Sequence, residues 1–194
     1  MELAEHCYSM LVVSASAKFN ESLTALLPRG QYEPVIFASD VSEARRLIVE
    51  NRFDIAIINT PLPDDFGTKL ALDICDTSGT GVLLLIRAEH YPDINARVSP
   101  WGVLTLSKPT SQSMITQSLQ LLCGTRERLR RMEQKTASIE EKMEEIRIIN
   151  RAKWLLIEQL KMTEKEAHRY IEKQAMDRCV TRRKIAENII STYK

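Results

Sequence analysis

A stretch of about 50 residues without proline constrains this chain more than any other feature. From Thr110, which can cap a helix start, to Lys161, no residue signals a helix break, and Gly124 is the only glycine. We therefore predict one long helix there, with Gly124 as a point of flexibility. This helix divides the 194-residue chain into a long N-terminal part and a short C-terminal part.

The middle of the predicted helix carries an apolar seam at heptad spacing, with charged residues on either side. The seam consists of Leu129, Met132, Ile139, Met143 and Ile146. A single helix would expose these side chains to water, whereas pairing with a second copy would cover them. We expect residues 111–150 to form a coiled-coil linker in a homodimer. The alternative is that the helix folds back on its own N-terminal part.

Charge is unevenly distributed along a chain whose net charge is only +1. Residues 1–110 contain 9 basic and 14 acidic side chains, whereas the last 48 residues, from Arg147, contain 12 basic and 6 acidic ones. Residues 111–146 are balanced, with 6 of each sign. An acidic part joined to a basic part indicates two domains with different partners.

Several classes of function are excluded by what the sequence lacks. Neither a CxxC motif nor a zinc-type Cys/His spacing occurs, so we expect reduced, mostly buried thiols in a cytoplasmic protein. The cysteines are Cys7, Cys75, Cys123 and Cys179. No apolar run is long enough to span a membrane, and no export leader is visible. No phosphate loop, catalytic triad or metal cluster stands at a usable spacing, so we expect no enzyme, no catalytic residue, no metal and no cofactor.

Short apolar segments alternate with helical ones over the first 110 residues. The expected strands are Tyr8–Ser14, Pro34–Ala38, Phe53–Asn59, Val82–Ile86 and Val103–Leu106. The third contains the continuous apolar run Ile55–Ile58, which is typical of a strand buried on both faces. This alternation predicts an α/β fold with a doubly wound, five-stranded parallel sheet.

Two motifs within this part resemble the receiver domain of response regulators, over residues 6–120. One is Asn59-Thr-Pro-Leu-Pro63 with Gly67 after the third strand, and the other is Lys108-Pro109 after the fifth. The resemblance implies a CheY/flavodoxin-like receiver of a two-component system. It also implies an aspartate nucleophile after strand three, an acidic Mg²⁺-binding pair after strand one, a hydroxyl on strand four and a lysine on strand five.

Most of these receiver residues are replaced in this chain. Asn59 stands at the phosphoacceptor position, and an amide cannot be phosphorylated as aspartate is. Ser14 and Ala15 stand at the acidic pair, Ile86 or Arg87 at the hydroxyl, and only Lys108 is retained. We interpret Asp64 and Asp65 as solvated loop carboxylates. We therefore expect a pseudo-receiver without a metal site, which can still bind a sensor protein or ligand at its sheet end.

The C-terminal part is predicted to contain three short helices, each with one apolar face. Thr163 followed by Glu166 forms a capping box, so one helix ends near Lys161 and the next begins at Glu164. Thr181 can cap a third helix.

This region resembles the ANTAR domain, a three-helix RNA-binding output module of bacterial transcription antiterminators, over residues 139–194. The matching groups are Ile149-x-x-Ala152-Lys153, Ala167, Gln174-Ala-Met-Asp-Arg178 and Arg182-Arg-x-Ile185-Ala186. Trp154 departs from the family, in which many members have glycine. We expect Trp154 to be at least partly buried in the core; the alternative is a face that stacks on a base.

The resemblance implies binding to stem-loops of a nascent leader transcript, and hence transcription antitermination. Duplex RNA hides its base edges, so sequence reading would fall on the loops. The predicted RNA-binding residues are Arg151, Lys153, Tyr170, Arg178, Arg182, Arg183 and Lys184. Two alternatives remain open: a DNA-binding response regulator that uses the last helix for recognition, and a dimeric adaptor without nucleic-acid binding.

Overall fold

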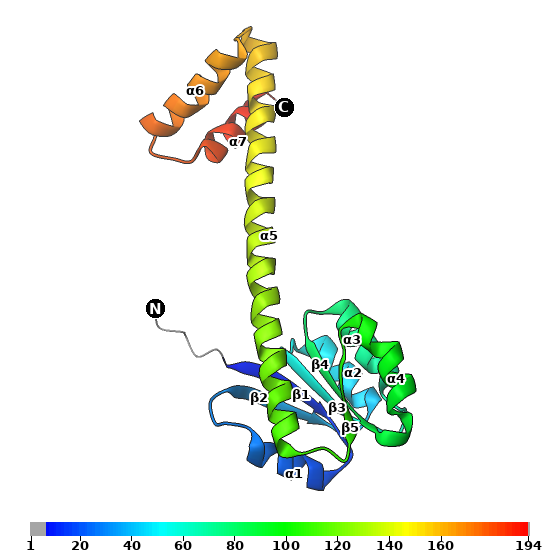
Figure 1. Ribbon diagram of the computed structural model, residues 1–194. Coiled ribbons are helices and arrows are strands. Elements are labelled where there is room, and N and C mark those ends of the chain that lie inside the picture. The colour runs from blue at the N-terminus through cyan, green and yellow to red at the C-terminus, as the bar shows by residue number, and fades with distance from the viewer. Residues whose placement is uncertain (1–6, 194) are drawn as a thin grey trace. The chain divides into compact units, whose positions relative to one another are not determined.

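The computed structural model describes residues 7–193 and divides the chain after Arg131 into two compact units. The first unit is an α/β domain, and the second is helical (Figure 1). One helix of 49 residues, α5 (Gln112–Leu160), contributes to both units and runs through Gly124. It begins one residue later than predicted, because Ser111 and not Thr110 caps it: the Met114 amide donates to Ser111 Oγ at 3.2 Å.

The first unit has the predicted doubly wound parallel sheet. The strands are β1 (Tyr8–Val13), β2 (Tyr32–Ala38), β3 (Ile55–Asn59), β4 (Gly81–Arg87) and β5 (Leu104–Lys108). Their order in the sheet is β2-β1-β3-β4-β5, and every neighbouring pair is parallel. The connecting helices are α1 (Ala17–Leu26), α2 (Val41–Glu50), α3 (Thr68–Thr77) and α4 (Tyr91–Val98). Short 3₁₀ turns, Ala88–His90 and Ser99–Trp101, flank α4. The predicted fold class is confirmed.

A separate hydrophobic core lies on each face of this sheet, because successive strand residues point to opposite sides. On β1, Leu11 and Val13 belong to the core under α2, α3 and α4, whereas Met10 and Val12 belong to the core under α1 and α5 (Figure 1). All of these strand side chains are fully buried. The second core includes Leu119 of α5, so the first part of the long helix is an integral layer of this unit.

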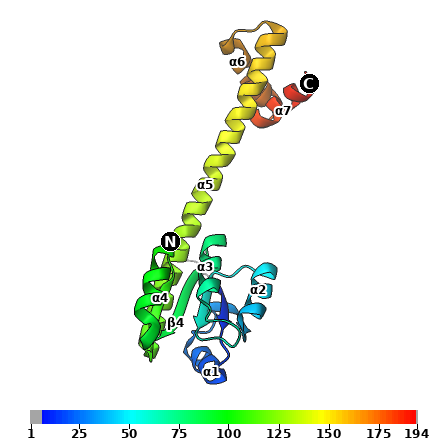
Figure 2. The ribbon, with the colours of Figure 1, turned by 90° about the vertical axis from the view of Figure 1, so that its right-hand side faces the viewer.

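The second unit consists of the last part of α5 with α6 (Glu164–Asp177) and α7 (Arg182–Thr192), which lie beside it (Figure 2). The predicted capping box is present: the Glu166 amide donates to Thr163 Oγ1 at 3.3 Å, and the Thr163 amide donates to Glu166 Oε2 at 2.8 Å. Thr181 caps α7 as predicted. Ala152 and Ala167 are completely buried in this core, where their small side chains allow the helices to pack closely.

Two predictions about burial are wrong. Trp154 is 70% exposed, because it lies about 200° around α5 from the buried Ala152 and so faces away from the helical core. The four cysteines are free thiols, but only Cys123 is buried, while Cys7 and Cys75 are partly exposed and Cys179 is exposed. None of the helices within residues 7–193 combines the length and apolar character that a membrane crossing requires.

Candidate functional site

At the carboxyl edge of the sheet, the structure brings together three polar residues from the ends of different strands. The Asn59 side-chain amide donates to Ser14 Oγ at 3.0 Å. Lys108 Nζ donates to Asn59 Oδ1 at 2.7 Å and also to the Thr60 carbonyl. The neutral amide of Asn59 therefore links the Ser14 hydroxyl, just after β1, to the Lys108 ammonium at the end of β5.

Lys108 and Arg87 bring two positive charges to this edge of the sheet. Burial lowers the pKa of Lys108, and the positive charge of Arg87 lowers it further. Neither Ser14 nor Asn59 carries a charge that would offset this effect. Within residues 7–193, no group of three or more His, Cys, Asp or Glu side chains is placed to hold a metal ion.

The two aspartates of the β3–α3 loop are exposed, as expected, but each has a structural partner that the sequence did not reveal. Asp64 accepts hydrogen bonds from the amides of Val41 and Ser42, both at 3.0 Å, at the start of α2. The bond from the Val41 amide is the main reason that the pKa of Asp64 is lowered. Asp65 Oδ1 accepts from the Gly67 amide at 2.7 Å. Both carboxylates thus shape the loop and its neighbouring helix.

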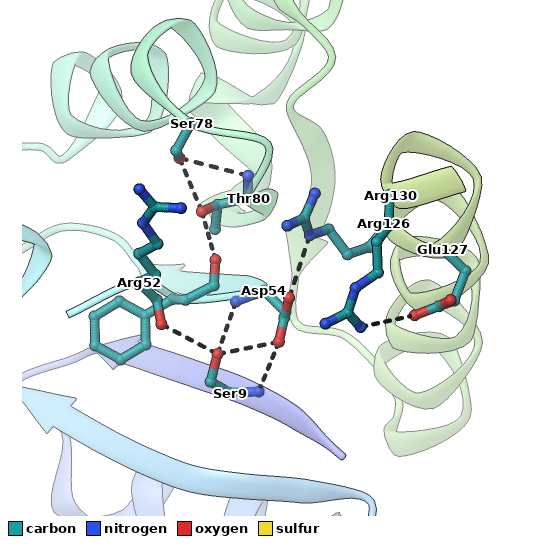
Figure 3. A network of polar contacts seen from close by, with 9 residues as sticks. Ser9, Arg52, Asp54, Ser78, Thr80, Arg126, Glu127 and Arg130 are labelled. Atoms are coloured by element: carbon teal, nitrogen blue, oxygen red, sulfur yellow. Dashed lines mark hydrogen bonds and ion pairs between the residues drawn. The ribbon is translucent and has the colours of Figure 1, made fainter. Parts of the chain in front are cut away.

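The opposite edge of the sheet holds a polar network that sequence reasoning missed (Figure 3). Asp54, just before β3, accepts hydrogen bonds from the Ser9 amide and hydroxyl, each at 3.1 Å. It also accepts from Arg126 Nε of α5 at 3.2 Å. Burial alone would raise the pKa of Asp54, but the hydrogen bonds from Ser9 and Arg126 outweigh it and hold the pKa below its usual value. The network fastens α5 to the sheet.

In the helical unit, three of the predicted RNA-binding cations are engaged in intramolecular ion pairs. Lys153 Nζ lies 3.2 Å from Glu164 Oε1, and the Lys153 side chain is only 16% exposed. Arg182 lies 3.5 Å from Glu172. Arg183 Nε donates to Glu187 Oε1 at 3.0 Å, and this bond raises the pKa of Arg183.

The other predicted residues are accessible. Arg151, Arg178 and Lys184 are exposed, and none of them forms an ion pair with another residue that the structure describes. Tyr170 is 39% exposed on α6. The predicted basic cluster is therefore divided into a paired set and an unpaired set.

A groove of about 180 Å³ runs between α6 and α7 and contains two of the accessible residues. Tyr170 and Gln174 of α6 line it together with Arg178, the residue directly after α6, at a spacing of four residues that places them on one side of the helix. From the other side it is lined by Asn188, Thr192 and Tyr193, and its floor is formed by Leu156, Ile185 and Ile189. Sequence reasoning selected Tyr170 and Arg178 but missed the rest, although the i, i+4, i+8 spacing was visible.

The predicted heptad seam is exposed along α5. Met132, Ile139, Met143 and Ile146 are each more than half exposed, and Leu129 is 40% exposed. Trp154 lies on the same side of the helix, because it follows Met143 by 11 residues, close to three full turns.

Three comparisons with known proteins agree with this architecture. The ANTAR domain family matches residues 137–190. A transcriptional regulatory protein from Mycobacterium tuberculosis, PdtaR, is 27% identical over 184 residues, which cover 94% of this chain and 89% of the relative.

Two solved structures resemble the first unit in fold. The signal receiver domain of an HD domain-containing protein from Pseudomonas fluorescens Pf-5 matches with a TM-score of 0.59 and 22% identity, covering 68% of this chain and 96% of that one. The chemotaxis response regulator CheY4 of Vibrio cholerae matches with a TM-score of 0.53 and 22% identity, covering 60% and 99%.

Proposed function

We propose that this chain, which joins a receiver-like domain to an ANTAR domain, is a response regulator that acts in transcription antitermination by binding stem-loops of nascent leader RNA. The ANTAR match, which extends over the end of α5 and all of α6, is the observation that carries the proposal. The exposed, unpaired cations Arg151, Arg178 and Lys184 and the accessible ring of Tyr170 support it, since RNA loops are bound by cations and aromatic rings.

We propose that the chain has three functional regions: a pseudo-receiver over residues 6–120, a coiled-coil linker over 111–150 and the ANTAR domain over 139–194. The hydrogen bonds of Asn59 to Ser14 and Lys108 support the first assignment, because an amide occupies the phosphoacceptor position and no acidic pair adjoins it. The input in this proposal is a sensor protein or a ligand at the sheet end, in place of phosphorylation.

The exposed seam supports a homodimer through α5. Charges beside the seam favour two parallel helices in register, because most basic residues on one side would then face acidic residues of the other copy. Two of the pairs between the copies are attractive: Arg128 faces Glu133, and Lys135 faces Glu140. A third pair, Lys142 with Arg147, is repulsive. An antiparallel pair would instead place the basic residues on one side of the seam against each other. A dimer would hold two ANTAR domains on one tether, which raises the effective concentration for a second hairpin.

A binding experiment with two randomised pools tests this function. The full chain would be incubated at low salt with stem-loop RNAs of random loop sequence and, separately, with duplex DNAs of random sequence. We expect selective retention of RNA and enrichment of loop sequences over several rounds. Preferential retention of duplex DNA would favour the DNA-binding alternative, and retention of neither pool would favour the adaptor. Either result would overturn the proposal.

A further inference from the structure

We propose that the α6–α7 groove, defined by Tyr170, Gln174, Arg178, Asn188 and Tyr193 around its apolar floor, holds one unpaired base of an RNA loop. The inference rests on the proposed RNA-binding function and names the place where sequence would be read. In this inference the paired cations Lys153, Arg182 and Arg183 do not take part in recognition of the RNA sequence.

The shape and composition of the groove suit a flat, partly apolar ligand. Leu156, Ile185 and Ile189 are largely or fully buried and give it an apolar floor. Tyr170 and Tyr193 are each more than a third exposed, so their rings are accessible from solvent. A volume of about 180 Å³ is below the range of roughly 300–1,000 Å³ that is typical of sites for drug-sized ligands, which favours a single base over a larger molecule.

The polar groups of the groove are available without any rearrangement. Among the residues that the structure describes, the side chains of Gln174, Arg178 and Asn188 form no hydrogen bond or ion pair. By contrast, Lys153, Arg182 and Arg183 each face a carboxylate, which a phosphate would have to displace. A ligand in the groove therefore gains new hydrogen bonds without the loss of existing intramolecular ones.

The chemistry of these side chains favours a base over a phosphate. Carboxamides such as Gln174 and Asn188 each present one acceptor and an adjacent donor, the pattern needed to recognise a base edge. Rings such as Tyr170 and the planar guanidinium of Arg178 stack on bases that are splayed out of a loop. A phosphate site would instead gather several cations, and among the groove's lining residues Arg178 is the one cation.

Loop RNAs enriched by the full chain supply the probe for a direct test. Each unpaired base would be replaced in turn by 2-aminopurine, whose fluorescence falls when it stacks on an aromatic ring. We expect quenching at one loop position on binding of the full chain and recovery of fluorescence with Tyr170→Ala. Absence of quenching at every position would overturn the proposal.

Affinity measurements by fluorescence anisotropy complete the test. Tyr170→Ala should weaken binding roughly 5- to 150-fold, the range that loss of one base–aromatic stack produces, whereas Tyr170→Phe keeps the ring and should bind like wild type. Gln174→Ala with Asn188→Ala should reduce discrimination among bases at the quenched position. Thermal unfolding by circular dichroism would confirm that these variants fold.

The outcomes separate this inference from the proposed function. Failure of the wild-type chain to enrich any RNA would refute the function itself. Wild-type binding that survives Tyr170→Ala and the Gln174/Asn188 double variant, with each of them folded, would refute the groove alone.

Discussion

Removal of the Arg126 guanidinium should loosen the first part of α5 from the receiver-like unit. Arg126→Met keeps the aliphatic stem but deletes the bond from Nε to Asp54 Oδ1. The two side chains are only 18% and 17% exposed, so solvent screens this pair less than a surface pair. A hydrogen bond to a charged group contributes roughly 1.5–3 kcal/mol, and an exposed ion pair up to about 1 kcal/mol. We expect a loss of about 1–2 kcal/mol, because Asp54 keeps its bonds from Ser9.

Hydrogen exchange resolved by peptide at pH 7 is the appropriate assay, since the chain has two compact units and exchange reports on each of them separately. Exchange should accelerate in β1, β3 and residues 112–126, while peptides of α6 and α7 serve as an internal control. Arg131→Met, at an exposed position of the same helix, is the matched control variant. Equal exchange in the two variants would refute the view that this pair fastens α5.

The same contact predicts a pH dependence whose sign follows from Asp54. The pKa of Asp54 is lowered in the folded state, so Asp54 binds a proton less readily there than in the unfolded chain, in which an aspartate has a pKa of about 3.9. The stabilisation by the Asp54 charge is therefore fully present at neutral pH. It is lost as the pH falls from about 3.9 to below the lowered pKa of the folded state. The difference in urea midpoint between wild type and Arg126→Met should accordingly shrink between pH 7 and pH 3. A constant difference would contradict the role given to the Asp54 charge.

Three further predictions concern other parts of the chain. Asn59→Asp should take up no phosphoryl group from acetyl phosphate and Mg²⁺, as measured by intact mass, because Ser14 and Ala15 supply no carboxylate for the metal; incorporation would contradict the loss of the switch. Ile139→Lys should convert a dimer to a monomer in light scattering, whereas Glu141→Lys, outside the seam, should not. Thr163→Ala should destabilise the helical unit by about 1 kcal/mol in thermal unfolding, through loss of the capping box, and an unchanged melting curve would count against that role.

Local signals explain the part of this fold that could be predicted from sequence. The strands were visible because each is a short apolar run, and β3 is buried at every residue. Thr163 and Thr181 were identified as caps because a capping residue and its target lie within three positions, and Asp40 caps α2 in the same way. These interactions are decided within a few residues and depend little on the rest of the chain.

Contacts between distant residues explain what was missed. Asp54 and Arg126 are 72 positions apart, and no pattern in either neighbourhood indicates the other. Asp64 was identified as a loop residue, but its role as a second cap for α2 depends on how the loop is placed 22 to 23 residues away. Trp154 was assigned to the core from its hydrophobicity, whereas its position on the far side of α5 from Ala152 decides its exposure.

The division of the basic residues into paired and unpaired sets leads to a prediction about salt. Counting charges along the C-terminal part gives six predicted RNA-binding cations, but Lys153, Arg182 and Arg183 are already neutralised by carboxylates. Each phosphate contact to a single strand contributes about −0.7 to the slope of log affinity against log salt. Three free cations therefore give a slope of about −2 per ANTAR domain, whereas six give about −4.

Anisotropy titrations of an enriched loop RNA between 50 and 300 mM salt, about a sixfold range, would separate these slopes. Lys184→Ala should flatten the slope by roughly 0.7, because it removes an unpaired cation. Arg183→Ala should leave the slope unchanged, because its guanidinium is held by Glu187. A wild-type slope near −4, or equal effects of the two variants, would mean that the ion pairs open on binding. The RNA would then be held by charge over the whole surface, and the α6–α7 groove would contribute little to affinity.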